Sequence, residues 1–234
     1  DRSSFVNNTA ETSGGAIFVG GSDEAVITNS VFYENKVTSG NGSVVFANTG
    51  TANLNFNTIV NNTGGAVLQG SGVTLSNSIL GQRLLSEDLC GSNVNIGDGN
   101  FITDDSCGAL PIYSPGIQDI SVQIPFGQMR IGRIYESADG SLQYFRVLSE
   151  SPVIDYITFH NETDPTTNIA SLNNNRPYSV PSVEVDRAYV GAVEVTSSPM
   201  LVRPFDSELT YAGLIVAEKL SVGGTMIPTS TAKI

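Results

Sequence analysis

The sequence predicts an all-β protein: a right-handed parallel β-helix with an irregular, disulfide-containing C-terminal cap. Short groups of strand-forming residues recur as near copies within the first ninety residues. Units too short to bury a core alone stack coil upon coil, each pairing in parallel with the next. No long stretch shows the apolar period of 3.6 residues that an amphipathic helix needs. An antiparallel sandwich also has short strands at regular spacing, but it does not require them to recur as copies.

The composition suits such a solenoid. Only 15% of the 234 residues are charged, while 40% are hydrophobic and 24 are glycine. Asn, Ser, Thr and Gly tolerate tight turns and form poor helices. The formal net charge of −12 repels phosphate backbones, so nucleic-acid binding is not expected. No run of 18 apolar residues occurs, so no membrane-spanning helix is expected.

The first recurring element is glycine-rich. It reads GGAIF at 14–18, GSVVF at 42–46 and GGAVL at 64–68. Glycine is required where a Cβ atom would clash, so we expect the paired glycines at a corner of each coil. The apolar residues that follow them predict a short strand.

The second element combines an alternating run with an asparagine motif. The runs AVIT, NLNF and VTLS are followed by NSVF, NTIV and NSIL, whose asparagines are Asn29, Asn57 and Asn77. SFVNN at 4–8 resembles the tail of an earlier copy, because Phe5 precedes Phe32 by 27 residues. We predict that the three asparagines stack as a ladder at a turn, where their amides bond to one another and tolerate a left-handed backbone.

These motifs resemble a known group of proteins. GGAI, GGAV and FYEN are similar to the GGA[ILV] and FxxN repeats of chlamydial polymorphic outer-membrane proteins and related bacterial β-helix adhesins. The resemblance implies a rigid module displayed at a cell surface.

After Leu80 the period is lost. NSIL, a Cys…DDSCG loop, SPVID and D…GAVE occur in the order found in the choice-of-anchor Q domain, which closes the C-terminal end of many bacterial surface β-helices. The resemblance covers 77–195. It departs from the family at Tyr156, which follows Asp155 where the family usually has glycine, and at 116–147, which reads as an insertion with strands of its own. We therefore expect coils at 1–89, a cap at 90–195 and a tail or further module at 196–234.

Cys90 and Cys107 are the only cysteines and lie 17 residues apart in loop sequence. Two cysteines do not complete a zinc site without histidines, and the single histidine is the distant His160. A disulfide is the preferred interpretation, with two unpaired buried thiols as the alternative. A disulfide would indicate an oxidising compartment, outside the cell or at its surface.

No catalytic residues are predicted. The adjacent Asp104 and Asp105 would point to opposite faces of a strand, so we interpret them as turn and cap residues. Together with Asp98 they are weak candidates for binding Ca²⁺, which prefers oxygen donors in a flexible loop. No other cofactor is indicated.

The expected function is therefore adhesion, binding or scaffolding, with cell-surface glycans or proteins as partners. A rival hypothesis is that the chain is the non-catalytic end of a polysaccharide lyase or hydrolase. A further hypothesis is a filament subunit that associates through an open N-terminal coil or its C-terminal tail, because exposed β-helix ends make contacts of this kind.

Overall fold

A computed structural model describes residues 1, 3–83, 87–136, 143–147, 151–153, 157–158, 187–188, 219–222 and 225–228. The chain divides into two compact units, Asp1–Val195 and Thr196–Ile234. In the second unit, β20 (Lys219–Val222) pairs antiparallel with β21 (Thr225–Pro228). His160 and the tail outside these two strands lie beyond the described residues.

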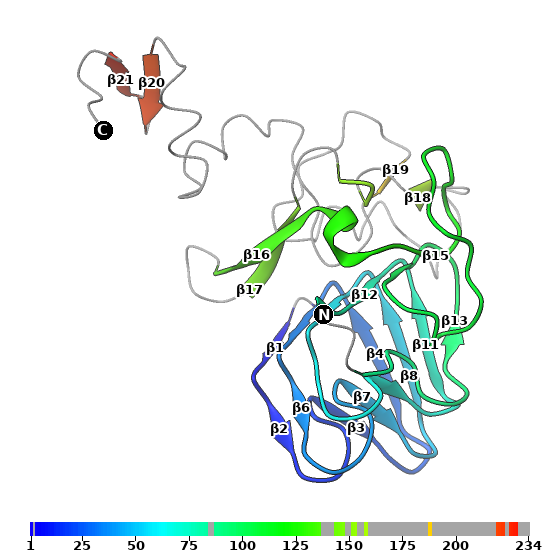
Figure 1. The fold of residues 1–234 in the computed structure, drawn as a ribbon. Coiled ribbons are helices and arrows are strands. Elements are labelled where there is room, and N and C mark those ends of the chain that lie inside the picture. The colour runs from blue at the N-terminus through cyan, green and yellow to red at the C-terminus, as the bar shows by residue number, and fades with distance from the viewer. Residues whose placement is uncertain are drawn as a thin grey trace. The chain divides into compact units, whose positions relative to one another are not determined.

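The first unit contains a parallel β-helix, which confirms the predicted fold class. Its six-stranded sheet orders β1 (Ser4–Val6), β5 (Val31–Tyr33), β9 (Thr58–Val60), β12 (Ile79–Gly81), β14 (Phe101–Ile102) and β15 (Val122–Gln123). Its four-stranded sheet contains β4 (Glu24–Thr28), β8 (Thr51–Asn55), β11 (Val73–Ser76) and β13 (Asn95–Ile96), side by side in Figure 1. The three-stranded sheet contains β3 (Ile17–Val19), β7 (Val45–Ala47) and β10 (Leu68–Gln69). Two-residue strands β2 (Thr9–Ala10) and β6 (Lys36–Val37) form a further pair, and every pairing among these strands is parallel.

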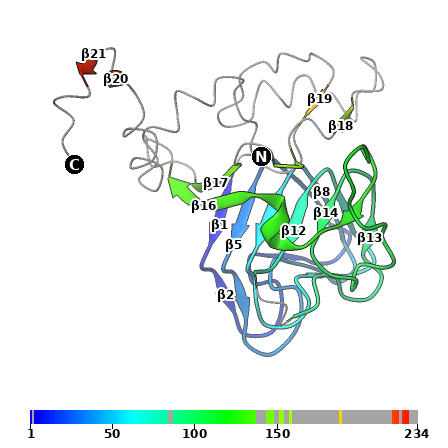
Figure 2. The ribbon, with the colours of Figure 1, turned by 45° about the horizontal axis from the view of Figure 1, so that its top comes forward.

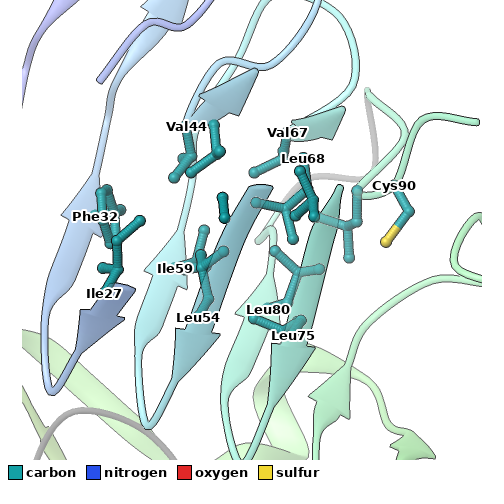
Figure 3. Packing of buried hydrophobic residues seen from close by; sticks show 14 of the residues in the cluster. Ile27, Phe32, Val44, Leu54, Ile59, Val67, Leu68, Leu75, Leu80 and Cys90 are labelled. Atoms are coloured by element: carbon teal, nitrogen blue, oxygen red, sulfur yellow. The ribbon is translucent and has the colours of Figure 1, made fainter. Parts of the chain in front are cut away.

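The three sheets enclose one apolar core. Alternate residues of each strand point inward, so equivalent side chains from successive coils meet in columns. Phe32, Ile59 and Leu80 form such a column, and all three are 0% exposed. Leu54 and Leu75 of the four-stranded sheet and Val44, Val67 and Leu68 beside them complete the core that Figure 3 shows.

The predicted repeat of Phe5 and Phe32 is confirmed. The two residues are partners in the register of β1 and β5, and their rings stack with centroids 4.7 Å apart and planes 3° from parallel. The close approach expected of the paired glycines is also confirmed. A Cβ atom at Gly64 would overlap the carbonyl oxygen of Val37, and one at Gly15 would overlap that of Ser43. Both oxygens belong to the neighbouring coil.

The register differs from the predicted asparagine ladder by one residue. Val31 pairs with Thr58, and Thr58 pairs with Ile79, so the first steps are 27 and 21 residues rather than 28 and 20. Asn29 and Asn77 therefore stand level with Phe56, and Asn57 belongs to the next column. The cause is burial: the observed register keeps the inward column of Phe32, Ile59 and Leu80 intact, whereas a shift by one residue would turn those side chains outward.

The coils also continue beyond Leu80, where the sequence period ends. β14 and β15 extend the six-stranded sheet, and β13 extends the four-stranded sheet. The segment 121–124, expected as part of an insertion, therefore supplies a strand of the helix itself. The sequence signal fades there because these coils have shorter strands and irregular loops, although the backbone ladder persists.

A hairpin covers the outer face of the six-stranded sheet. The 3-10 helix η1 (Phe126–Met129) leads into β16 (Ile131–Glu136), which pairs antiparallel with β17 (Gln143–Val147). Phe145 lies edge-on to Tyr33 at 5.3 Å, and Gln143 exchanges hydrogen bonds with the Ser4 hydroxyl. Figure 2 shows the hairpin beside β1. A second apolar cluster fills this contact: Val31, Phe56, Val60, Ile79, Phe101, Val122, Ile124, Met129, Ile131, Phe145, Val147 and Val153. Farther along the chain, β18 (Ile157–Thr158) pairs antiparallel with β19 (Arg187–Ala188).

Candidate functional site

Two polar ladders border the six-stranded sheet and hold its register. The ladder before the strands is made of Ser and Asn residues. Each backbone N–H donates to the side chain one coil further on: Ser3 to Ser30 Oγ, Ser30 to Asn57 Oδ1, Asn57 to Ser78 Oγ, Ser78 to Asn100 Oδ1 and Asn100 to Ser121 Oγ, at 2.9–3.1 Å. These bonds give each of these backbone N–H groups an acceptor, and a buried backbone N–H needs one.

The ladder after the strands is made of asparagine alone. The N–H of Asn8 donates to Asn35 Oδ1, and that of Asn35 donates to Asn62 Oδ1. Each amide nitrogen repeats the same step, from Asn8 to Asn35 at 2.8 Å and from Asn35 to Asn62 at 2.9 Å. Asn35 and Asn62 are 0% and 1% exposed. The FxxN motif at 32–35 contains this ladder's middle residue, so its asparagine has a structural role.

The three asparagines predicted as one ladder have separate roles. Asn29 and Asn77 adopt left-handed φ angles of 50° and 49°, as expected of a turn. Asn77 Nδ2 donates to Asn55 Oδ1 at 2.9 Å, and Asn29 Nδ2 donates to Asp1 Oδ1 at 2.8 Å. Asn57 belongs to the Ser/Asn ladder described above. The prediction aligned Asn57 with Asn29 and Asn77, whereas Asn57 lies one position later, in the column of Ser30 and Ser78. The error arose because both of these neighbouring columns contain asparagine.

The predicted disulfide between Cys90 and Cys107 is present, with Cα atoms 4.9 Å apart. The backbone of Cys90 forms a parallel β-bridge with Leu68, at the end of the three-stranded sheet. The disulfide anchors the loop that follows Cys90 at this place. Ser106 Oγ accepts the N–H groups of Leu89 and Cys90 at 2.9 and 3.0 Å. The loop thus occupies the sheet edge in place of another strand.

Asp104 completes this closure and Asp105 does not take part. One carboxylate oxygen of Asp104 accepts the Leu89 N–H at 3.2 Å, and the other accepts the N–H and hydroxyl of Ser106 at 3.0 and 2.6 Å. Asp105 and Asp98 are exposed. Within the described residues, no group of three His, Cys, Asp or Glu side chains is arranged to hold a metal ion. The geometry gives Asp104 a capping role.

The outer face of the four-stranded sheet is a regular, polar and nearly uncharged surface. Two columns cross its coils: Val26, Asn53, Thr74 and Asn95, and Thr28, Asn55 and Ser76. Their side chains are exposed or half-buried. Glu24 carries the single charge of these four described strands, and Asn53 Nδ2 donates to it at 3.1 Å. Neighbouring rows repeat at the strand spacing of about 4.8 Å.

An aromatic pair lies on the outer face of the three-stranded sheet. Phe18 is 56% exposed, and its ring stacks on Phe46 with centroids 5.7 Å apart and planes 9° from parallel. Gln69 follows in the same column, and its amide donates to Ser92 Oγ at 3.3 Å. The exposed Phe18 ring offers an apolar face that a ligand could cover. Sequence reasoning missed it, although phenylalanine recurs at the last position of both GGAIF and GSVVF.

We name these two outer faces together the rung face, defined by the columns of Val26, Thr28 and Phe18. The four-stranded sheet presents hydroxyl and amide groups to a ligand at a regular repeat, and the three-stranded sheet presents an aromatic ring. Such groups donate and accept hydrogen bonds without a charge. The rung face therefore suits a neutral, hydroxyl-rich ligand with apolar patches.

Among the residues that the structure describes, no helix is long and apolar enough to cross a bilayer. Comparisons with protein-family models, with curated proteins and with solved structures found no match.

Proposed function

We propose that this chain is a ligand-binding module of an exported, surface-displayed β-helix adhesin, and that the rung face binds glycan chains. The observation that carries the proposal is the rung face itself, with polar, nearly uncharged rows on the four-stranded sheet and the exposed Phe18 ring on the three-stranded sheet. Sugar hydroxyls can bond to Asn, Ser and Thr side chains, while the C–H face of a sugar ring can cover an aromatic ring.

Two further observations support display outside the cell. The Cys90–Cys107 disulfide suits an oxidising environment. The motif order in 77–195 supports a cap of the choice-of-anchor Q kind, and the GGA and FxxN repeats support kinship with bacterial β-helix adhesins. The assignment of the cap to the choice-of-anchor Q kind and the kinship with β-helix adhesins are both part of the proposal.

Rigidity also supports a binding role. The two ladders and the core hold the rows of the rung face in one register, so little conformational freedom is lost when a ligand binds. Preorganisation of this kind improves affinity without additional contacts.

A glycan array tests the proposal, using the intact chain and two variants, Phe18→Ala and Asn53→Ala. We expect neutral glycans to bind the unchanged chain and both variants to bind more weakly, by about tenfold for the loss of one good contact. Ile112→Ala is the matched control, because Ile112 is an exposed apolar residue outside the rung face, at 65% exposure against 56% for Phe18. Binding that both variants retain in full would overturn the proposed site.

A reducing-sugar assay on the glycans that bind separates adhesion from degradation. The proposal predicts no release of sugar ends over the course of the assay. Turnover of a bound glycan would favour the polysaccharide-degrading enzyme instead.

A further inference from the structure

A buried hydroxyl in the second coil has no bonding partner. Ser43 is 0% exposed, and no group of the described residues forms a hydrogen bond with its Oγ. Its register neighbours on the adjacent coils are Gly15 and Ala66, and neither has a polar side-chain atom. An unpaired buried hydroxyl lowers the stability of a fold, and its presence needs an explanation. The residues at 15 and 66 indicate that the coil accepts a small side chain without a hydroxyl here.

The position of Ser43 in the sequence supplies that explanation. Ser43 lies two residues after Asn41, with Gly42 between them. Asn-x-Ser/Thr, with x other than proline, is the acceptor sequence for N-linked glycans in exported chains. The hydroxyl at its third position is part of what the transferase recognises. The hydroxyl that the folded chain leaves unpaired is therefore one that this modification requires.

The Asn41 side chain is placed to carry a large group. Asn41 is exposed, and so are residues 38–40 before it. Its Oδ1 accepts the N–H of Ala66 at 3.3 Å, and among the described residues its Nδ2 forms no hydrogen bond. An N-linked sugar is attached through Nδ2 and leaves Oδ1 as an acceptor. The bond to Ala66 is therefore compatible with the modified side chain.

The chain has three other sequences of the same type, and the described ones lack this feature. They begin at Asn7, Asn61 and Asn161. The hydroxyl residues of the first two, Thr9 and Thr63, are exposed. A solvated threonine on a surface rich in Asn and Thr needs no special explanation. Asn161 lies outside the described residues.

We propose that Asn41 is an acceptor for an N-linked glycan, which is attached during export and before the coil around Ser43 closes. The donor is an oligosaccharide carried on a polyprenyl pyrophosphate. A bond forms between Nδ2 and the anomeric carbon of the first sugar, and the bond from that carbon to the pyrophosphate oxygen breaks. One amide proton passes to a base of the transferase. Complete burial of Ser43 sets the order, because a transferase reaches this hydroxyl only in the unfolded chain.

The disulfide supports this route. The Cys90–Cys107 pair suits an oxidising compartment, which exported chains enter. The inference does not depend on the rung face, so failure of the glycan-array experiment would leave it intact.

Mass spectrometry of the intact protein from its own organism tests the proposal. Trypsin releases residues 37–83 as one peptide, because Lys36 and Arg83 are the nearest cleavage sites. That peptide contains both Asn41 and Asn61, so fragmentation must assign the glycan to one of them. We expect a glycan on Asn41.

Ser43→Ala separates the modification from the fold. It removes the hydroxyl and introduces the side chain that Ala66 already has, so the glycan on Asn41 should be lost completely. When both chains are produced without glycans, the melting temperature of Ser43→Ala should equal or exceed that of the unchanged chain. Thr63→Ala is the matched control, because it removes an exposed hydroxyl and should leave the Asn41 glycan in place.

Three results would overturn the proposal. The first is native protein in which Asn41 carries no glycan, including protein in which Asn61 alone is modified or Asn41 has only been hydrolysed to aspartate. The second is a Ser43→Ala chain that keeps its glycan. The third is a lower melting temperature for Ser43→Ala, because the hydroxyl would then have a structural role. The measurement on the native protein stands even if Ser43→Ala fails to fold.

Discussion

Asn62 Oδ1 accepts two hydrogen bonds from Asn35, one from its backbone N–H at 2.8 Å and one from its side-chain amide at 2.9 Å. Asn35 in turn accepts from Asn8 and donates to the carbonyl of Phe5 at 2.8 Å. One buried side chain thus links three successive coils. The backbone N–H groups of Asn8 and Asn35 and the carbonyl of Phe5 are all bonded through this ladder.

Asn35→Ala should lower the free energy of unfolding by about 2–4 kcal/mol, since it leaves more than one buried polar group without its partner. Urea denaturation measures this. Asn8→Ala is the control: Asn8 is exposed at the end of the same ladder, so its loss should cost about 1 kcal/mol or less. Equal costs for the two variants would show that ladder position does not matter.

Gly64→Ala should prevent folding or destabilise the chain by about 3 kcal/mol or more. Gly64 has a φ of 92°, and an added Cβ would overlap the Val37 carbonyl oxygen, which belongs to the backbone and does not move aside. Gly127→Ala is the control, because nothing lies within 4 Å of a Cβ built there. Thermal unfolding followed by circular dichroism distinguishes them, and a native-like melting temperature for Gly64→Ala would contradict the inter-coil contact.

Asp104→Ala should destabilise the chain by about 1–3 kcal/mol, because the N–H and hydroxyl of Ser106 lose their acceptor and the Leu89 N–H keeps only its bond to Ser106. The neighbouring Asp105→Ala removes the same charge from an exposed position and should change stability by less than about 0.5 kcal/mol. Chemical denaturation of both variants measures the difference. If calcium raised the stability of the unchanged chain but not of Asp104→Ala, Asp104 would bind a metal ion in addition to capping the Leu89 edge.

Reduction of the disulfide should destabilise the chain by about 3 kcal/mol, the loop-closure contribution expected for a separation of 17 residues. The double variant Cys90→Ser and Cys107→Ser should show the same loss and no response to a reducing agent. Melting temperatures with and without reductant provide the test. An unchanged melting temperature on reduction would mean that Ser106 and Asp104 alone close this end.

Tyr33 should ionise at higher pH than an ordinary tyrosine. A side-chain hydrogen bond to Glu34 raises the pKa of Tyr33 above 10.0, and partial burial raises it further. Because the folded state then holds this proton more tightly than the unfolded state, the stabilising contribution is complete below pH 10 and is lost as the pH rises through the folded pKa. The near-ultraviolet titration difference between the unchanged chain and Tyr33→Phe isolates this phenol.

Glu34→Gln is the matching variant for that titration. It removes the carboxylate that contributes most to the shift, so the pKa of Tyr33 should fall toward its ordinary value. A pKa of Tyr33 that stays as high in Glu34→Gln would mean that desolvation by burial dominates instead.

Local sequence predicts an element well where a residue's role depends on its own coil. The glycine-rich corners, the strands that follow them and the pairing of Phe5 with Phe32 could all be inferred, because each is repeated in nearly the same form. The Cys90–Cys107 disulfide followed from composition and loop context. The irregular coils after Leu80 could not be recognised, because β14 and β15 have two residues each and their parallel neighbours supply the pattern.

The rung face was equally hard to foresee. Phe18 and Val26 look like core residues in sequence, and their orientation depends on which neighbouring residue, Val19 or Ile27, turns inward. The sequence does not distinguish the adjacent Asp104 and Asp105. Only Asp104 accepts a hydrogen bond from the Leu89 N–H in the structure.

The sequence by itself determined that short copied strands would stack in parallel, because none of them buries enough surface alone and each copy matches the next. Only the tertiary structure decided the register between coils. Aligning Asn57 with Asn77 gives a step of 20 residues, whereas the observed pairing of Thr58 with Ile79 gives 21, and the two registers bury different side chains. The tertiary structure also decided that β16 and β17 cover a sheet face, because that contact joins residues more than a hundred positions apart, such as Ser4 and Gln143.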